Sequence, residues 1–95
     1  MTRFCQGEEQ LIGMEGQTVE LKYYILKQEM FYEDLSKEIT AYGIEIEKTE
    51  NAVVEISRLE DITCNKDEID SITRVLKENK VLPVHLQDVV LDMIS

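Results

Sequence analysis

The first half of the chain contains runs in which apolar and polar residues alternate, which is typical of β-strands with one buried face. From Thr18 the apolar positions recur at every second residue, and they are Val19, Leu21, Tyr23 and Ile25. Residues 42–48 alternate in the same way, so that Tyr42, Ile44 and Ile46 share one face. We expect Glu45 and Glu47 to face water. A turn around Asn51, which accepts positive φ, separates this run from a third one over residues 52–57. The pattern predicts an antiparallel hairpin over residues 42–57, to which residues 18–27 add a third strand.

After Ile62 the apolar period changes to 3.6 residues, which predicts helices. Asn65 is a good helix N-cap, and Glu68 follows at the spacing of a capping box. The apolar face of this helix comprises Ile69, Ile72, Val75 and Leu76. Pro83 favours a second helix start, and the last helix is expected from about Val84 to Ile94. The fold class is therefore α+β, a three-stranded antiparallel sheet covered on one face by two C-terminal helices.

Two segments lack a clear period. Residues 1–16 hold three of the four glycines, and their apolar residues are scattered, so we expect a loose, flexible N-terminal arm. Residues 17–95 then form a single small α+β domain. For residues 29–41, a short helical turn and a wide loop both fit. Some apolar residues stay without a place in the core: Leu26 and Met30 on the second sheet face, and Phe4, Leu11, Ile12 and Met14 in the arm.

Length and charge exclude several classes of protein. A chain of 95 residues with 43% hydrophobic residues supports one modest core. It is too short for a dinucleotide-binding unit with a substrate domain, or for a barrel enzyme. Ten basic residues stand against twenty acidic ones, giving a net charge of −10, so we expect no direct nucleic-acid binding. The charge serves solubility, or it attracts a partner with a basic surface.

The cysteines and the ends bear on the compartment. No stretch approaches the ~18 apolar residues of a membrane span, and the first residues lack the apolar region of a signal peptide. We therefore expect a cytoplasmic protein that binds no membrane. Cys5 and Cys64 are then two free thiols rather than a disulfide. They form no C-x-x-C motif, and two thiols cannot build a four-thiolate zinc site.

His85 is the only histidine, and it stands three residues before Asp88 and seven before Asp92. Imidazole and carboxylate are ligands of divalent metals, but His85 and Asp92 would lie ~10 Å apart along a helix. Only His85 with Asp88, or Asp88 with Asp92, could hold one ion, which makes His85 and Asp88 weak metal candidates. The alternative is that these residues are solvated. We expect no metal, no cofactor and no catalytic residue, because no nucleophile constellation or phosphate-binding glycine loop is present.

Two stretches together resemble a family of small uncharacterised proteins. They are Tyr42-Gly43-Ile44, which begins the hairpin, and the C-terminal pattern P-x-H-L-x-D-V-x-x-D over residues 83–92. The resemblance covers roughly residues 18–95 and is to a domain-of-unknown-function family from clostridia and related Firmicutes. It implies no known activity, substrate or cofactor.

The expected function is that of a non-catalytic protein-interaction or regulatory domain, bacterial and cytoplasmic, and a monomer or homodimer. A partner or a second copy could bind the uncovered sheet face or an unpaired edge strand. A first alternative is an acidic inhibitor that mimics nucleic acid and occupies a nucleic-acid-binding protein. A second is a metal-assisted hydrolase at His85 and Asp88.

Overall fold

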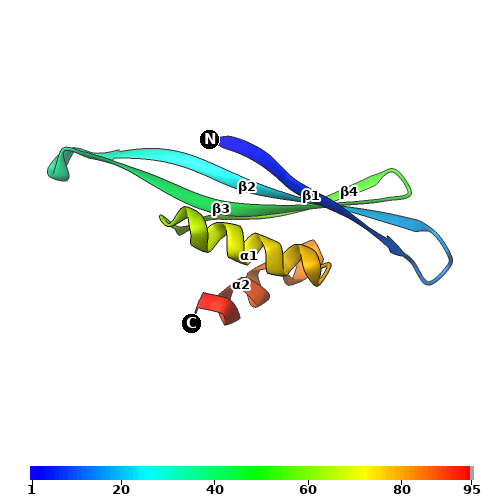
Figure 1. Ribbon diagram of the computed structural model, residues 1–95. Helices are drawn as coiled ribbons and strands as arrows, with labels where there is room; N and C mark the ends of the chain where they lie inside the picture. The colour runs from blue at the N-terminus through cyan, green and yellow to red at the C-terminus, as the bar shows by residue number, and fades with distance from the viewer. Residues whose placement is uncertain (95) are drawn as a thin grey trace.

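The computed structural model describes residues 1–94, except for the side chain of Leu35. It shows one antiparallel sheet whose four strands lie in chain order, followed by two helices that pack on one face of the sheet (Figure 1). The strands are β1 (Thr2–Ile12), β2 (Thr18–Tyr32), β3 (Lys37–Glu50) and β4 (Val53–Thr63), and the helices are α1 (Lys66–Glu78) and α2 (Leu86–Ile94). The α+β class with C-terminal helices is confirmed.

The prediction of three strands and a flexible N-terminal arm is wrong, because residues 2–12 form the edge strand β1. The register of β1 against β2 shifts between Cys5 and Gly7. A bulge of this kind moves the following side chains to the opposite face. Phe4 and Leu11 therefore both lie on the helix side of the sheet, although their spacing is odd. This shift hides the period of two in the sequence.

Residues 29–41 do not form a wide loop. Their only helical part is one short 3-10 turn over Glu33–Leu35. They continue β2 and β3 as a paired ribbon, in which Met30 lies opposite Ile39. This ribbon extends past the ends of the helices at the left of Figure 1. The molecule is correspondingly long, with extents of 55 × 26 × 18 Å and a radius of gyration of 14.8 Å. A compact chain of this length would have about 12 Å.

The predicted hairpin of β3 and β4 is confirmed. Its turn consists of Asn51 and Ala52, whose φ angles are 52° and 63°. Two consecutive left-handed residues define the type I′ turn that suits the twist of a two-residue hairpin. Strand β4 is the other edge of the sheet.

Helix α1 begins as predicted at the Asn65 cap, whose side-chain oxygen accepts the backbone N–H of Glu68 at 3.1 Å. The second helix starts later than expected, because Pro83–His85 form a 3-10 turn before Leu86. Tyr23 is fully buried, and its hydroxyl donates to the Val81 carbonyl at 3.0 Å, which ties β2 to the segment between the helices. The core lies between sheet and helices and comprises Leu21, Tyr23, Ile25, Ile44, Ile46, Ile69, Ile72, Leu76, Leu86 and Val90.

The other side of the sheet carries no layer of helices within residues 1–94 (Figure 1). We call this side the open face. Because side chains alternate along each strand, the register assigns its members. They include Arg3, Cys5 and Ile12 of β1, Lys22, Tyr24 and Leu26 of β2, Gly43, Glu45 and Glu47 of β3, and Val54, Ile56 and Arg58 of β4.

Candidate functional site

Glu45 lies at the centre of the open face and is fully buried, although no helix covers it. It belongs to β3, with Tyr24 of β2 on one side and Arg58 of β4 on the other. Water is excluded by the neighbouring side chains themselves. The expectation that Glu45 faces water is therefore wrong, while Glu47, two residues on, is partly exposed.

Two arginines hold the Glu45 carboxylate from opposite sides. Arg3 donates from Nη1 to Oε2 at 2.5 Å, and Arg58 donates from Nε and Nη2 to Oε1 at 3.0 and 2.6 Å. Both carboxylate oxygens are thus satisfied by charged donors, which is what a buried carboxylate requires. Each arginine remains nearly half exposed, at 45% and 46% of its side chain.

The Arg3 side chain reaches from β1 across β2 to β3. Its guanidinium lies 4.1 Å from the centre of the Tyr24 ring, in cation–π contact. It also lies 3.7 Å from Glu47, while Arg58 lies 3.7 Å from Glu60. The triad of Arg3, Glu45 and Arg58 joins three strands on the side that the helices leave open, and the contact of Arg3 with Tyr24 adds the fourth, β2.

The charge state of Glu45 follows from these contacts. Burial, the largest single effect, raises the pKa of the carboxyl, but the hydrogen bonds and charges of Arg3 and Arg58 together lower it below its usual value of 4.5. Glu45 is therefore ionised at neutral pH and fully engaged. Both oxygens of this carboxylate are already occupied by arginine donors, so neither is free to accept a proton as a general base would.

Apolar side chains accompany the triad on the open face. Ile56 and Val54 of β4 are each 53% exposed, and Ile12 of β1 is 74% exposed. They lie toward the hairpin ends of β1–β2 and β3–β4, opposite Glu47, Thr49 and Thr18. Leu26, on the same face, is buried. The expectation that it is available to a partner is therefore wrong.

The weak metal candidates lie in and just before the second helix, α2. His85 ends the 3-10 turn before α2, while Asp88 and Asp92 belong to α2, and all three are exposed. Within residues 1–94 no group of three or more histidine, cysteine or acidic residues is placed to hold a metal ion. Cys5 and Cys64 are exposed free thiols.

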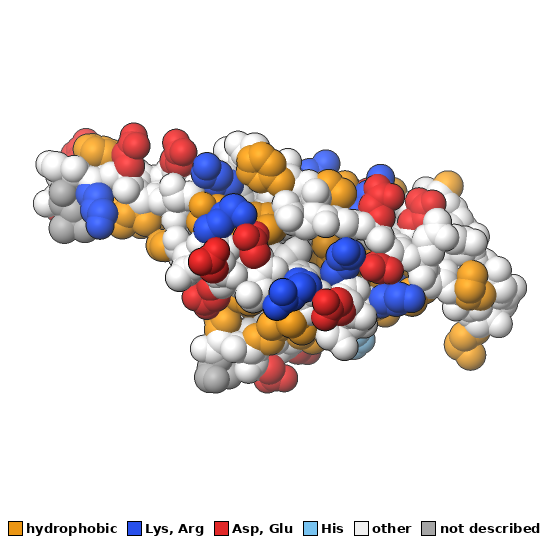
Figure 2. Space-filling view, viewed as in Figure 1, with side chains coloured by type: hydrophobic (Ala, Val, Ile, Leu, Met, Phe, Trp, Pro, Cys, Tyr) orange, Lys and Arg blue, Asp and Glu red, His pale blue; other side chains and the backbone are white. Residues whose placement is uncertain are grey.

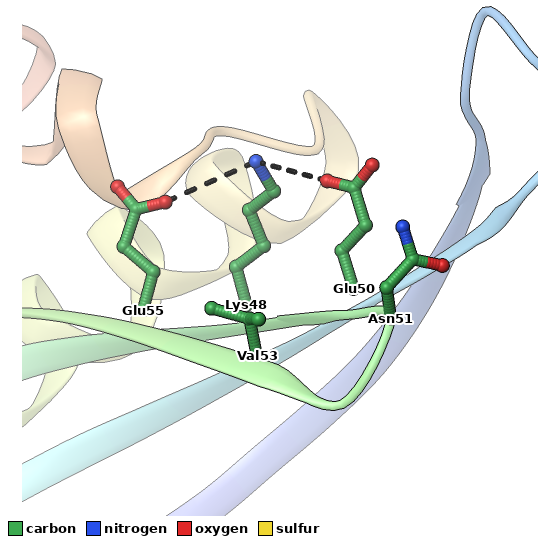
Figure 3. A pocket seen from close by; sticks show the side chains of 5 residues that line it. All are labelled: Lys48, Glu50, Asn51, Val53 and Glu55. Carbon is green, nitrogen blue, oxygen red and sulfur yellow. Dashed lines mark ion pairs between the residues drawn. The ribbon is translucent and has the colours of Figure 1, made fainter.

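The hollows in the surface are open, and their volumes range from about 190 to about 400 Å³. One, of about 250 Å³, lies beside the β3–β4 turn on the helix side and is lined by Lys48, Glu50, Asn51, Val53 and Glu55 (Figure 3). Lys48 lies between Glu50 at 3.5 Å and Glu55 at 3.9 Å, so its charge is shared by two carboxylates. The volume falls below the range typical of ligand pockets, and the charged groups face each other rather than a ligand.

Charged side chains of both signs are interspersed over α1 and the adjoining sheet edge (Figure 2). On the open face, acidic residues are close to cations: Glu8 lies 4.0 Å from Lys22, in addition to the pairs of Arg3 and Arg58. The excess of negative charge is therefore not gathered into one unbroken acidic row on either of these surfaces.

The sequence alone does not indicate the triad, because Arg3 stands in a segment without a clear period and no local pattern assigns it a partner. The alternation did place Glu45 on the side away from the core. A signal was available in β4, where Arg58 follows the hairpin turn at the position that lies opposite Glu45. No sequence pattern marked the contribution of Arg3.

The sheet, its single helix layer and the ion triad define a small α+β protein built on an antiparallel four-stranded meander. The chain belongs to DUF6514, a family of unknown function whose model matches residues 2–95. Membership of a family of unknown function, expected from two motifs, is confirmed, and the match extends through β1. Searches of the curated proteins and of the solved structures found no match. No helix within residues 1–94 is long and apolar enough to cross a membrane.

Proposed function

We propose that this chain is a non-catalytic interaction domain that binds a protein partner across its open face. The observation that carries the proposal is the combination of exposed Ile12, Val54 and Ile56 with the fixed arginines of the triad on a face without a helix layer. Apolar side chains supply the area that a complex buries, and ordered arginines are frequent at interface centres.

The rigidity of the triad supports this proposal. A side chain that is already held loses little conformational freedom when a partner binds. Arg3 and Arg58 are held by Glu45, yet nearly half of each side chain is exposed to a partner. The net charge of −10 attracts a partner with a basic surface over a distance, and the open face then makes the contacts.

The acidic inhibitor of nucleic-acid-binding proteins gains no support from this geometry. Such a mimic presents unpaired carboxylates in a row. Glu45 and Glu47 would give a spacing of about 7 Å along β3, but both lie within 4 Å of arginine. A hydrolase at His85 and Asp88 has no third ligand among the described residues.

The test is affinity capture from a lysate of the source organism with three forms of the chain. The binding variant carries Val54→Ser and Ile56→Ser on the open face. The control carries Val84→Ser and Leu91→Ser, which remove two apolar side chains of the helix layer, 66% and 50% exposed, without changing charge. We expect the same protein to be captured by the unmodified chain and the control but not by the binding variant. Equal capture by all three, or capture of no protein, would contradict the proposal.

A further inference from the structure

The two edges of the sheet differ in how well they are protected from pairing with another strand. An edge strand presents free backbone N–H and C=O groups and invites pairing unless it is short, bulged or covered. Edge β1 is interrupted by the bulge between Cys5 and Gly7, and the Lys77 side chain of α1 lies over Gly7. Edge β4 is regular from Val53 to Leu59, with its irregularity further on, where Asp61 has a positive φ.

The hairpin turn determines which backbone groups of β4 are free. In a two-residue hairpin the flanking residues, Glu50 and Val53, form a hydrogen-bonded pair, and bonded and non-bonded pairs then alternate. Val54, Ile56 and Arg58 are therefore in non-bonded pairs with β3, and their N–H and C=O groups point outward. Their side chains lie on the open face, where Val54 and Ile56 are exposed.

We infer that β4 pairs with β4 of a second copy of this chain, antiparallel and with Ile56 opposite Ile56 on the two-fold axis. The inference goes beyond the proposed function, because it concerns the strand edge rather than the open face. It joins two four-stranded sheets into one of eight strands, with all three outward-pointing residues of each copy forming hydrogen-bonded pairs.

Charge and side-chain matching select this register from its neighbours. Shifting the axis to Glu55 would set Glu55 against Glu55, and shifting it to Arg58 would set Arg58 against Arg58, which is unfavourable for directly opposed residues. An axis at Ser57 avoids like charges, but it sets apolar Ile56 and Val54 against Arg58 and Glu60. An axis at Ile56 sets one apolar residue, Val54, against Arg58, but it gives an apolar pair at the centre, and it places Val53 opposite Leu59 on the other face of the sheet.

The net charge makes a specific prediction about salt. Each copy carries −10, so two copies repel each other over long range while the apolar and backbone contacts hold at short range. Screening by salt should therefore strengthen the dimer. An association that depended on ion pairs between copies would weaken instead.

Sedimentation velocity over a series of protein concentrations, at low and high NaCl, tests the dimer. We expect a monomer–dimer equilibrium that shifts toward dimer as NaCl rises. Ile56→Lys, which sets two lysines face to face, should raise the dimer dissociation constant at least about tenfold. The matched control Ile12→Lys, an exposed open-face residue of β1, should leave it unchanged. Circular dichroism establishes that both variants fold.

Cross-linking tests the register in a background with Cys5→Ser and Cys64→Ser. Ile56→Cys should form a disulfide-linked dimer under mild oxidation, since opposed residues of a bonded pair lie about 5.5 Å apart at Cα. Val54→Cys should not form a disulfide-linked dimer, because Val54 of one copy lies opposite residue 58 of the other, four residues away from that copy's Val54.

A monomer at every concentration and salt, or a dimer that Ile56→Lys leaves intact, would overturn the inference. Cross-linking through Val54→Cys alone would overturn it as well. A monomer that still captures a partner through Val54 and Ile56 would leave the proposed function standing.

Discussion

A carboxylate is costly to bury, and Glu45 is buried because two arginines satisfy both of its oxygens. The arrangement depends on strands that are far apart in sequence. Glu45 is 42 residues from Arg3 and 13 from Arg58. The sheet register brings the three together at a place where the helices offer no protection. The local stability of the open face therefore rests on one side chain.

Glu45→Gln tests this dependence. The neutral amide fits the same space but leaves two arginines without their shared counter-charge. We expect the free energy of unfolding, measured by urea denaturation, to fall by about 1–3 kcal/mol, less than for a fully buried pair because both guanidinium groups keep contact with water. Glu47→Gln on the same strand and face is the control, and it should change stability by less than about 0.5 kcal/mol. If the two variants lowered the free energy of unfolding equally, the triad would contribute no more to stability than an ordinary surface ion pair.

The pH dependence of stability follows from the lowered pKa of Glu45. A carboxyl whose pKa is lower in the folded state stabilises the fold above its unfolded-state pKa, near 4.5, and this stabilisation is lost as the pH falls through the folded-state pKa. We expect the urea midpoint to fall as the pH drops below about 4.5. In Glu45→Gln the midpoint should be lower at neutral pH, but its dependence on acid should be shallower. If the urea midpoint of Glu45→Gln fell with pH as steeply as that of the unmodified chain, Glu45 would not be the source of this acid dependence.

At the scale of elements, the β3–β4 contact depends on Gly43. Gly43 is buried, and a Cβ there would overlap the backbone carbonyl of Leu59 and lie 2.9 Å from the Cα of Glu60, where β4 is bulged. Backbone cannot move aside as a flexible side chain can. We expect Gly43→Ala to lower the free energy of unfolding by about 1–3 kcal/mol, measured by urea denaturation.

Gly7→Ala is the matched control, because it is the same substitution in a strand of the same sheet. At Gly7 the nearest atoms are Cδ and Cε of Lys77, at 2.6 and 2.8 Å, and this side chain can move away. The expected change is within about 1 kcal/mol and of either sign, since alanine also restricts the unfolded chain. A loss at Gly7 as large as that at Gly43 would contradict the role of the bulge.

The elements that could be predicted from sequence are those whose period is unbroken. Residues 18–27, the hairpin and the Asn65 cap were predictable because one local rule governs each of them. Strand β1 was not, since its bulge shifts the apolar residues between faces. The outer ribbon of β2 and β3 could not be predicted from sequence. Neither of its faces is covered by helices, so its strands do not need to alternate apolar and polar residues. The triad depends on long-range register, which no local pattern encodes.

At the scale of the whole molecule, the body under the helices and the projecting ribbon are unequal in stability. Side chains from Phe31 to Glu38 are exposed wherever they are described, whereas residues 21–26 of β2 lie in or beside the core. Stability that comes from burial should therefore decline along the ribbon.

Excision of the ribbon tip tests this division. Residues 31–38 are removed, and Met30 is joined to Ile39 by an Asn-Gly turn, which suits a two-residue hairpin at that bonded pair. We expect the free energy of unfolding to change by less than about 1 kcal/mol, because the described side chains of the excised segment are exposed and the closing loop becomes shorter. Urea denaturation and a proton–nitrogen NMR spectrum of the remaining residues provide the measurement. Loss of cooperative unfolding would show that the tip is part of the folding unit.

The order in which the three members of the triad leave the ribosome has a consequence for how the sheet is completed. Arg3 emerges first of the three, Glu45 follows after 42 residues, and Arg58 comes 13 residues later still. Until Arg58 is released, the carboxylate has a cation on one side only and stays accessible to water. The ion cluster can therefore close only after β4 has been synthesised, and its closure marks a sheet in which both the first and the last strand have been paired.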